Sequence, residues 1–301
     1  MRFVVTGGEG FIGRNIVSML RDRGHDVISL DINGKPDRLV SVLDYDALRK
    51  VFMGADGVFH LAAVTSPPQF EENPQLGFVN NVTGTLNVVL AGAKEKVRRI
   101  AFASSSATYG MTGSKTSEGM QVIAHNNLYP ITKVVGEMLG KYVSLRGETE
   151  FVSLRYFNAY GPGENTKSLY SSVIWKFVEA SLSGKDLVIY GDGTQSRDFI
   201  YVTDVARATI EAFDRGRNGE CYNIGSGVSN DFNTIARMVK DALGIPSRIV
   251  HVDNPLKNYQ NYTLADISKI RSETGWKPVV GLEEGIRMTA EWQKACSSHQ
   301  P

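Results

Sequence analysis

The chain has 301 residues, of which 33 are Lys or Arg and 32 are Asp or Glu, so the net charge is +1. This balance argues against nucleic acid as a partner, because binding to phosphate backbones needs a clustered positive excess. No apolar run approaches the roughly 20 residues that span a bilayer, and the N-terminus lacks a signal-peptide pattern. Because Cys221 and Cys296 are the only cysteines, we expect no disulfide framework, no metal site and a cytoplasmic location.

The first 155 residues alternate short β-branched segments with longer segments of helical period. This pattern is typical of βαβ units around a parallel sheet. The expected strands cover residues 3–6, 26–30, 57–61, 99–103 and 151–155. The expected helices cover residues 11–22, 46–52, 80–96 and 129–145.

After residue 155 the pattern loosens. A loop rich in Gly, Pro and Asn is followed by an expected strand at 187–190 and by expected helices at 169–183, 203–214, 231–243 and 282–292. We therefore predict an α/β fold of the Rossmann type, a doubly wound parallel sheet with a smaller C-terminal α/β substrate lobe. The predicted division is a cofactor-binding domain over 1–160 and a substrate lobe over 161–301, with segments around 185–214 returning to the first domain.

A glycine-rich segment, Gly-Gly-Glu-Gly-Phe-Ile-Gly at residues 7–13, follows the first expected strand and opens a helix. In such a turn Gly7 permits the sharp bend, Gly10 lets the backbone approach a pyrophosphate, and Gly13 allows close helix packing. We expect Phe11 and Ile12, at the start of the helix, to border the same cofactor. For the motif alone, a sharp turn without a ligand is the alternative.

Asp31 ends the next expected strand, 18 residues after Gly13. A carboxylate there accepts the hydroxyls of an adenosine ribose and repels a 2′-phosphate, which favours NAD over NADP. Lys35 weakens this preference, since a lysine can reach a phosphate. Asp44 and Tyr45 follow a third extended segment and are expected beside the adenine; for Asp44, a helix N-cap is an equally good interpretation.

Tyr129 and Lys133 lie four residues apart on one helix face. A nearby ammonium stabilises a phenolate, as does an oxidised nicotinamide ring, and together they bring a tyrosine pKa from about 10 toward the range of a general base. The sequence Ser-Ser-Ser-Ala-Thr-Tyr-Gly at 104–110 follows an expected strand, so its hydroxyls point into the ligand crevice of an open sheet. One of these hydroxyls would hold the reacting oxygen.

With these motifs in order, the chain resembles the extended short-chain dehydrogenase/reductase family, specifically its nucleotide-sugar epimerase and dehydratase branch. The resemblance rests on the glycine motif, Asp31, His-Leu-Ala-Ala at 60–63, the serine segment at 104–110, Tyr129 with Lys133, and Gly-Asp-Gly-x-x-x-Arg-Asp-Phe at 191–199. These motifs extend over about two thirds of the chain. The tail segments 222–225 and 275–278 are also similar.

The resemblance implies a catalytic set of Ser105, Tyr129 and Lys133. Ser105 is the hydroxyl, with Ser106 as its neighbouring alternative; Tyr129 is base and acid, and Lys133 holds the nicotinamide ribose. The further cofactor contacts that it implies are Leu61, Ala62, Ala63, Asn81 and Tyr156. For Asn81, a helix N-terminal cap is the alternative.

On the substrate side, the resemblance implies that Asn158 donates to the sugar nucleotide and that Arg197 pairs with its pyrophosphate. A guanidinium fork suits a diphosphate, although an ion pair of Arg197 with Asp198 or Asp204 is the alternative. The chain lacks the second arginine that similar 4-epimerases carry near the C-terminus. Lys257 and Gln260 would take its place.

Lys167 stands where the heptose 6-epimerases of this family keep an extra acid/base lysine, and a solvated loop lysine is the alternative. The reaction implied first is epimerisation of a UDP-sugar through a transient keto sugar, of the UDP-glucose/UDP-galactose 4-epimerase type. An ADP-glycero-manno-heptose 6-epimerase is the alternative, ahead of a 4,6-dehydratase and a non-catalytic NAD(H)-binding sensor.

The family also implies a homodimer formed through the helices at 82–96 and 131–145.

Overall fold

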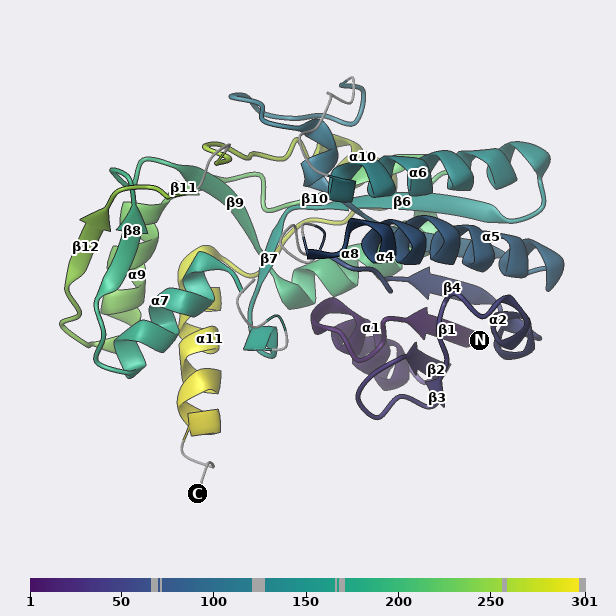
Figure 1. Cartoon of the computed structure of the whole chain (residues 1–301), viewed down its shortest axis with the longest axis horizontal. Helices are drawn as coiled ribbons and strands as arrows, with labels where there is room; N and C mark the ends of the chain where they lie inside the picture. The colour runs from purple at the N-terminus through teal and green to yellow at the C-terminus, as the bar shows by residue number, and fades with distance from the viewer. Residues whose placement is uncertain are drawn as a thin grey trace.

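Seven strands of the described residues form one parallel sheet, which crosses the right half of Figure 1. The computed structural model describes residues 1–65, 70, 72–120, 128–165, 167, 171–255 and 259–297. Across the sheet the strand order is β10-β6-β5-β4-β1-β2-β3. The strands are β1 (Arg2–Thr6), β2 (Asp26–Asp31), β3 (Arg38–Leu39), β4 (Gly57–His60), β5 (Arg99–Ser105), β6 (Glu150–Tyr156) and β10 (Cys221–Ile224).

The chain builds this sheet in two directions. From β1 it runs outward to β2 and β3, then returns past β1 to β4 and continues outward to β5 and β6. The reversal lies between β1 and β4, and ligands of open α/β sheets bind outside the carboxyl ends of the strands at such a point. The five strands expected in the first 155 residues all form within two residues of their expected bounds, which confirms the predicted Rossmann-type sheet.

Alternate residues of β1 serve opposite faces of the sheet, as the two-residue strand period requires. Phe3 and Val5 join a core with α1 and α8, whereas Val4 joins a second core with α2, α5 and α6. Each face is therefore covered by helices, which is why the strands are continuously apolar. The helices are α1 (Phe11–Asp22), α8 (Val202–Arg215), α2 (Tyr45–Phe52), α5 (Gly84–Lys94) and α6 (Leu128–Arg146).

Helix α6 packs closely against the sheet because two of its glycines face aromatic rings. A Cβ added at Gly136 would lie 2.3 Å from the Phe102 ring, and one added at Gly140 would lie 2.0 Å from the Phe151 ring. Larger residues at these positions would push the helix outward. The close approach brings the Lys133 side chain of α6 against the end of β5.

The helix expected at 80–96 begins earlier and is interrupted. Helix α4 (Pro74–Phe78), a π-helical turn η1 (Val79–Thr83) and α5 follow one another directly. Single π turns inside helices occur frequently at functional sites, because the extra residue redirects side chains. Here the turn contains Asn80 and Asn81, and Asn81 contacts Val64 in the loop after β4.

A second lobe, at the left of Figure 1, has its own apolar core. Its strands are β7 (Asn158–Tyr160), β9 (Ser196–Tyr201) and β11 (Ser229–Asp231) in one sheet, and β8 (Leu187–Tyr190) with β12 (Ile249–Val252) in another. Its helices are α7 (Val173–Leu182), α9 (Phe232–Leu243) and α11 (Leu282–Ser297). A short helix, α10 (Ser268–Thr274), contacts α8 and β10. Within the described ranges, no helix is both long and apolar enough to cross a membrane.

The segment that returns to the parallel sheet differs from the expected residues 185–214. Strand β8 pairs with β12, and β9 pairs with β7 and β11, so both belong to the sheets of the second lobe. Only α8 returns, packing against α1, and β10 then joins the edge of the large sheet beside β6. Sequence periodicity predicts that a segment is a strand but not which strand it pairs with. The sheets to which β8 and β9 belong are therefore known only from the structure.

Candidate active site

A cavity of about 1340 Å³ opens at the carboxyl ends of β1, β2, β4, β5 and β6 and extends to α7 and β8. Most of the residues singled out in the sequence line it. These are Gly7, Gly10, Phe11, Ile12, Gly13, Asp31, Leu61, Ala62, Ala63, Ser105, Tyr129, Lys133, Tyr156, Asn158, Lys167 and Arg197. The cavity is thus shared by the sheet and the second lobe.

The glycine turn is built as its spacing predicts. Gly7 has φ +69°, and a Cβ on Gly13 would lie 2.0 Å from the Gly7 carbonyl oxygen. Gly10 is the N-cap of α1 and provides no side-chain cap, so N–H groups of the first turn have no side-chain acceptor there. Such a helix N-terminus, facing a cavity, suits an anionic group.

Asp31 lies at the end of β2, beside this turn. Its Oδ2 accepts a hydrogen bond from the Glu9 amide at 3.1 Å, and its Oδ1 accepts one from the Ile32 amide at 2.8 Å. A residue that the sequence did not single out, Asp37, holds the following loop: its Oδ2 accepts from the Ser29 amide at 2.7 Å and pairs with Arg21. The loop thereby presents the Asp31 carboxylate to the cavity.

The predicted reactive groups meet at the end of β5. Ser105, Tyr129 and Lys133 all line the cavity there, and Lys133 Nζ donates to the Ala103 carbonyl at 2.7 Å. Lys133 Nζ lies 5.8 Å from the centre of the Tyr129 ring. Burial raises the pKa of Tyr129, and the hydrogen bond from Ser105 opposes this by stabilising the phenolate. Burial also lowers the pKa of Lys133 to about 7, while the charge of Glu137 raises it.

His60, the histidine of the His-Leu-Ala-Ala motif, is fully buried, and its ring is hydrogen-bonded to side chains of β1 and α5. Its Nδ1 lies 2.7 Å from Thr6 Oγ1, and its Nε2 lies 3.0 Å from Thr85 Oγ1. Because the Thr85 hydroxyl donates to the Asn81 carbonyl, it accepts from Nε2, which fixes the imidazole tautomer. Burial and the Lys133 charge lower the His60 pKa to about 3, so the ring stays neutral.

Asn81 is buried and does not itself line the cavity, and it lies inside the π turn rather than at a helix cap, which contradicts the cap interpretation. Its buried amide accepts from the Val64 amide and donates to the Val64 carbonyl, both at 2.8 Å. The amide also donates to Thr132 Oγ1 at 3.1 Å. Asn81 therefore ties the loop after β4 to the helix that carries Tyr129 and Lys133.

Other expected contacts are also absent from the cavity lining: Asp44, Tyr45, Ser106 and Gln260. Asp44 caps α2 by accepting from the Ala47 amide at 2.9 Å, and Tyr45 is the first residue of that helix. Ser106 turns into the short 3₁₀ helix η2 (Ser106–Tyr109), and the Gln260 amide donates to the Tyr262 carbonyl at 2.8 Å. Lys257 lies outside the described residues.

Arg197 is buried at the opposite end of the cavity. Its guanidinium lies 5.5 Å from the Phe232 ring centre and 5.3 Å from that of Tyr259. It donates to the main-chain carbonyls of Ser196 and Gln260. Among the described residues no ion pair joins it to Asp198 or Asp204. The guanidinium is therefore a cation at the cavity without a carboxylate partner.

Asn158 and Lys167 are both anchored by other parts of the chain. The Asn158 amide donates to the Asp198 carbonyl and to Thr263 Oγ1, each at 3.1 Å. Lys167 Nζ lies 3.1 Å from the buried Glu164 carboxylate and 4.1 Å from the Phe11 ring centre. Lys167 is thus neither a freely solvated lysine nor an unpaired cation.

The cavity also has a wall that the sequence analysis missed, formed by α7 and β8. Leu187 and Ile189 of β8 are buried, whereas Val188 is 48% exposed and Tyr190 is 39% exposed, and both line the cavity. Because they occupy alternate strand positions, Val188 and Tyr190 lie on the same face of β8 and together form an apolar part of the cavity wall. The alternation was visible in the sequence, but the side that faces a ligand was not.

Three comparisons place these features among known proteins. A model of the NAD dependent epimerase/dehydratase family matches residues 3–225. A putative UDP-glucose 4-epimerase of Methanocaldococcus jannaschii is 34% identical, and the match covers 97% of this chain and 98% of the relative. A UDP-N-acetyl-alpha-D-glucosaminuronate decarboxylase of Bacillus cytotoxicus is 33% identical, and the match covers 97% of this chain and 97% of the relative. The crystal structure of UDP-glucose 4-epimerase with UDP-glucose from Thermotoga maritima superimposes with a TM-score of 0.92, at 28% identity, over 99% of this chain and 100% of the other.

Proposed function

Because this chain belongs to the NAD-dependent epimerase/dehydratase family, within the extended short-chain dehydrogenases/reductases, we propose that it inverts C4 of a UDP-hexose of the glucose/galactose type. Family membership confirms the predicted resemblance, the fold class and NAD as the cofactor, and it makes the chain an enzyme. The choice of substrate and carbon is the proposal. The observation that carries it is the meeting of Ser105, Tyr129 and Lys133 in a cavity whose far end holds Arg197.

The residues at the glycine turn fit NAD. A Cβ on Gly10 would contact only the Gly7 carbonyl, at 3.1 Å, so Gly10 leaves room for a pyrophosphate at the N-terminus of α1. The Asp31 carboxylate at the end of β2 is suited to the hydroxyls of the adenosine ribose. When bound there, NAD would supply reversible hydride transfer at the sugar carbon.

In the proposed mechanism, Tyr129 exchanges a proton with the sugar hydroxyl at the reacting carbon. The Ser105 hydroxyl holds the same oxygen, and the Lys133 ammonium stabilises the phenolate form of Tyr129. Oxidation makes a keto sugar, which turns within the cavity and is reduced on its other face. One acid/base therefore suffices, because the same tyrosine serves both half-reactions.

The substrate end of the cavity supports a nucleoside diphosphate. Arg197 supplies an unpaired guanidinium for the diphosphate, and Val188 with Tyr190 offers an apolar surface for a base. The UDP-glucose bound in the Thermotoga structure supports uracil as that base. The heptose 6-epimerase alternative needs Lys167 as a second acid/base, and the pairing of Lys167 with Glu164 favours a structural role instead.

The proposal is tested by incubating the purified protein with UDP-glucose, UDP-galactose, UDP-N-acetylglucosamine, UDP-glucuronate and ADP-heptose and following the anomeric protons by NMR. We expect interconversion of UDP-glucose and UDP-galactose. Conversion of the heptose alone would refute the C4 assignment, and release of CO₂ from the uronate would assign a decarboxylase.

Replacing Tyr129 by Phe removes the acid/base but keeps the ring. We expect kcat to fall by about 10³-fold or more, while NAD binding, measured by isothermal titration calorimetry, changes little. Val188→Ala, which trims the apolar wall of the cavity away from the reacting centre, is the control: it is expected to raise KM and to leave kcat nearly unchanged. Normal turnover by the Tyr129→Phe variant would show that another group is the base.

A further inference from the structure

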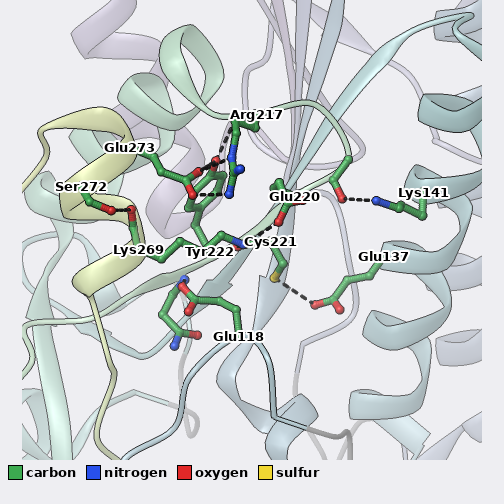
Figure 2. Close-up of polar contacts among 12 residues, drawn as sticks. Glu118, Glu137, Lys141, Arg217, Glu220, Cys221, Tyr222, Lys269, Ser272 and Glu273 are labelled. Carbon is green, nitrogen blue, oxygen red and sulfur yellow. Dashed lines mark hydrogen bonds and ion pairs between the residues drawn. The ribbon is translucent and has the colours of Figure 1, made fainter.

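Behind the cavity, α6, β5, β6 and β10 meet around one carboxylate, that of Glu137. Figure 2 shows the contact of Glu137 with Cys221 of β10. Glu137 Oε1 accepts from the Ser104 hydroxyl at 2.5 Å and from Arg155 Nε at 2.9 Å. Glu137 Oε2 accepts from Arg155 Nη2 at 2.7 Å, and the Cys221 thiol lies 3.8 Å from Oε1. The pair is well buried, with 6% of the Arg155 side chain and 14% of the Glu137 side chain exposed.

Two strands of this network, β5 and β6, continue into the candidate active site. Ser104 immediately precedes Ser105, and Arg155 immediately precedes Tyr156, which also lines the cavity. On α6, Glu137 follows Lys133 by four residues, which is one helical turn. The carboxylate thus links the ends of two strands to the helix that carries the acid/base pair.

The charge of Glu137 also reaches Lys133. The groups that face Lys133 are the neutral His60 from β4, the Phe102 ring and Ala103 carbonyl from β5, and Tyr129 and Glu137 from α6. Burial lowers the pKa of Lys133 to about 7, and Glu137 is the group whose charge opposes that effect. Glu137 itself is faced by Arg155 from β6 and by Cys221 from β10.

We propose that Glu137 is a positioning residue for the reaction: its buried carboxylate holds the ends of β5 and β6 against α6, and its negative charge helps to keep Lys133 an ammonium. The proposal rests on the proposed function, because it assigns Glu137 an effect on the Ser105, Tyr129 and Lys133 centre. Glu137 does not line the cavity and therefore acts through these neighbours.

The charge effect has a definite sign. Glu137→Gln keeps the shape and removes the negative charge, so the ammonium form of Lys133 becomes less stable and its titration moves to lower pH. Lys133 assists Tyr129 only while charged, so kcat is lost as pH rises through the Lys133 pKa. We expect this alkaline loss to begin about one pH unit lower in the variant, which leaves about tenfold less kcat above the midpoint.

The titration of Lys133 is measured without turnover. The NAD-loaded protein is labelled with ¹³C at the lysine ε carbons, and the resonance of Lys133 is identified by its absence from a Lys133→Arg variant. Its chemical shift is followed from pH 5 to 10 in the wild type and in Glu137→Gln. The pH profile of kcat is recorded in parallel with the active UDP-sugar.

Two variants separate charge from contact. Ser104→Ala removes a hydrogen bond to Glu137 but keeps its charge, so the Lys133 titration is expected to stay in place. Glu150→Gln breaks a matched pair on the same two strands, since Arg99 donates to Glu150 at 2.7 Å at the opposite end of β5 and β6. This variant is expected to change neither the titration nor the pH profile.

An unchanged Lys133 midpoint in Glu137→Gln overturns the proposal, and a downward shift with unchanged controls supports it. If that variant fails to fold because Arg155 is left unpaired, Glu137→Gln with Arg155→Met removes both charges. A smaller downward shift is then expected, because loss of the Arg155 cation partly offsets loss of the carboxylate. If the wild type turns over no UDP-sugar, the proposed function fails, while the Lys133 titration still judges the effect of Glu137.

Discussion

At the scale of single residues, two cations at the cavity differ in what surrounds them. Lys167 is paired with the buried Glu164 carboxylate. Within the described part of the chain, Arg197 lies near two aromatic rings and donates only to main-chain carbonyls. Burial lowers the pKa of the Arg197 guanidinium, because its charge has lost solvation without gaining an anion. A bound diphosphate would restore that missing partner, so Arg197 is where we expect substrate charge to be recognised.

Arg197→Met is therefore expected to raise KM for the UDP-sugar by about 10- to 100-fold, the equivalent of about 1.5–3 kcal/mol for a charge-assisted hydrogen bond, with a smaller effect on kcat. Steady-state kinetics measure this. Arg197→Lys keeps the charge but loses the fork and should recover only part of the affinity. If Lys167→Met raised KM more than Arg197→Met, the roles of the two cations would be reversed.

At the scale of elements, the position of the acid/base pair depends on how closely α6 approaches the sheet. Lys133 reaches the Ala103 carbonyl because glycines at 136 and 140 leave no side chain between the helix and the rings of Phe102 and Phe151. The helix itself was predictable from its pattern. The distance between helix and sheet follows only from which strands lie beneath it.

Gly140→Ala places a methyl group 2.0 Å from the Phe151 ring. We expect a loss of about 1–3 kcal/mol in the free energy of unfolding from overpacking, only partly offset by the helix propensity of alanine, together with a lower kcat as Lys133 moves. Denaturant unfolding measures the first effect. Lys141→Ala, on the exposed side of the same helix, is the control and should change stability by no more than about 0.5 kcal/mol. Equal stability of Gly140→Ala and wild type would show that α6 can shift without cost.

At the scale of the whole molecule, α5 and α6 lie side by side on one face of the sheet (Figure 1). Both helices carry exposed apolar side chains. On α6, Met138 is 66% exposed, and Tyr142 and Leu145 follow at helical spacing; Leu86 and Leu90 do so on α5. Adjacent apolar stripes of this kind suit a second copy of the chain. We propose that the protein is a homodimer through this face.

Sedimentation velocity is expected to give a species of twice the chain mass. Met138→Glu with Leu145→Glu should convert it to a monomer, because charges would be buried unpaired in the contact. Val279→Glu, which alters an exposed apolar residue away from both helices, is the matched control and should remain dimeric. A monomeric wild type at micromolar concentration would rule out this interface.

Local sequence establishes the cofactor half of this protein. The glycine turn and the pair of Tyr129 with Lys133 on one helix face are each specified by spacings of a few residues, and Asp31 ends the next strand, 18 residues after the turn. Such spacings translate directly into geometry, since a strand, a turn and a helix have nearly constant dimensions. The five strands and the α/β class follow from the same short-range periodicity.

Contacts between distant segments decide the rest. Arg197 gains its aromatic neighbours from residues 35 and 62 positions later, Asn81 becomes a brace through a residue 51 positions away, and Glu137 meets Ser104 and Arg155 from two other strands. The return of α8 and β10 to the large sheet likewise depends on distant contacts, because α8 packs against α1 and β10 pairs with β6. Sequence periodicity predicts how exposed a residue is but not which residues contact it. Only the tertiary structure therefore shows whether a polar side chain caps a helix, links two elements or faces a ligand.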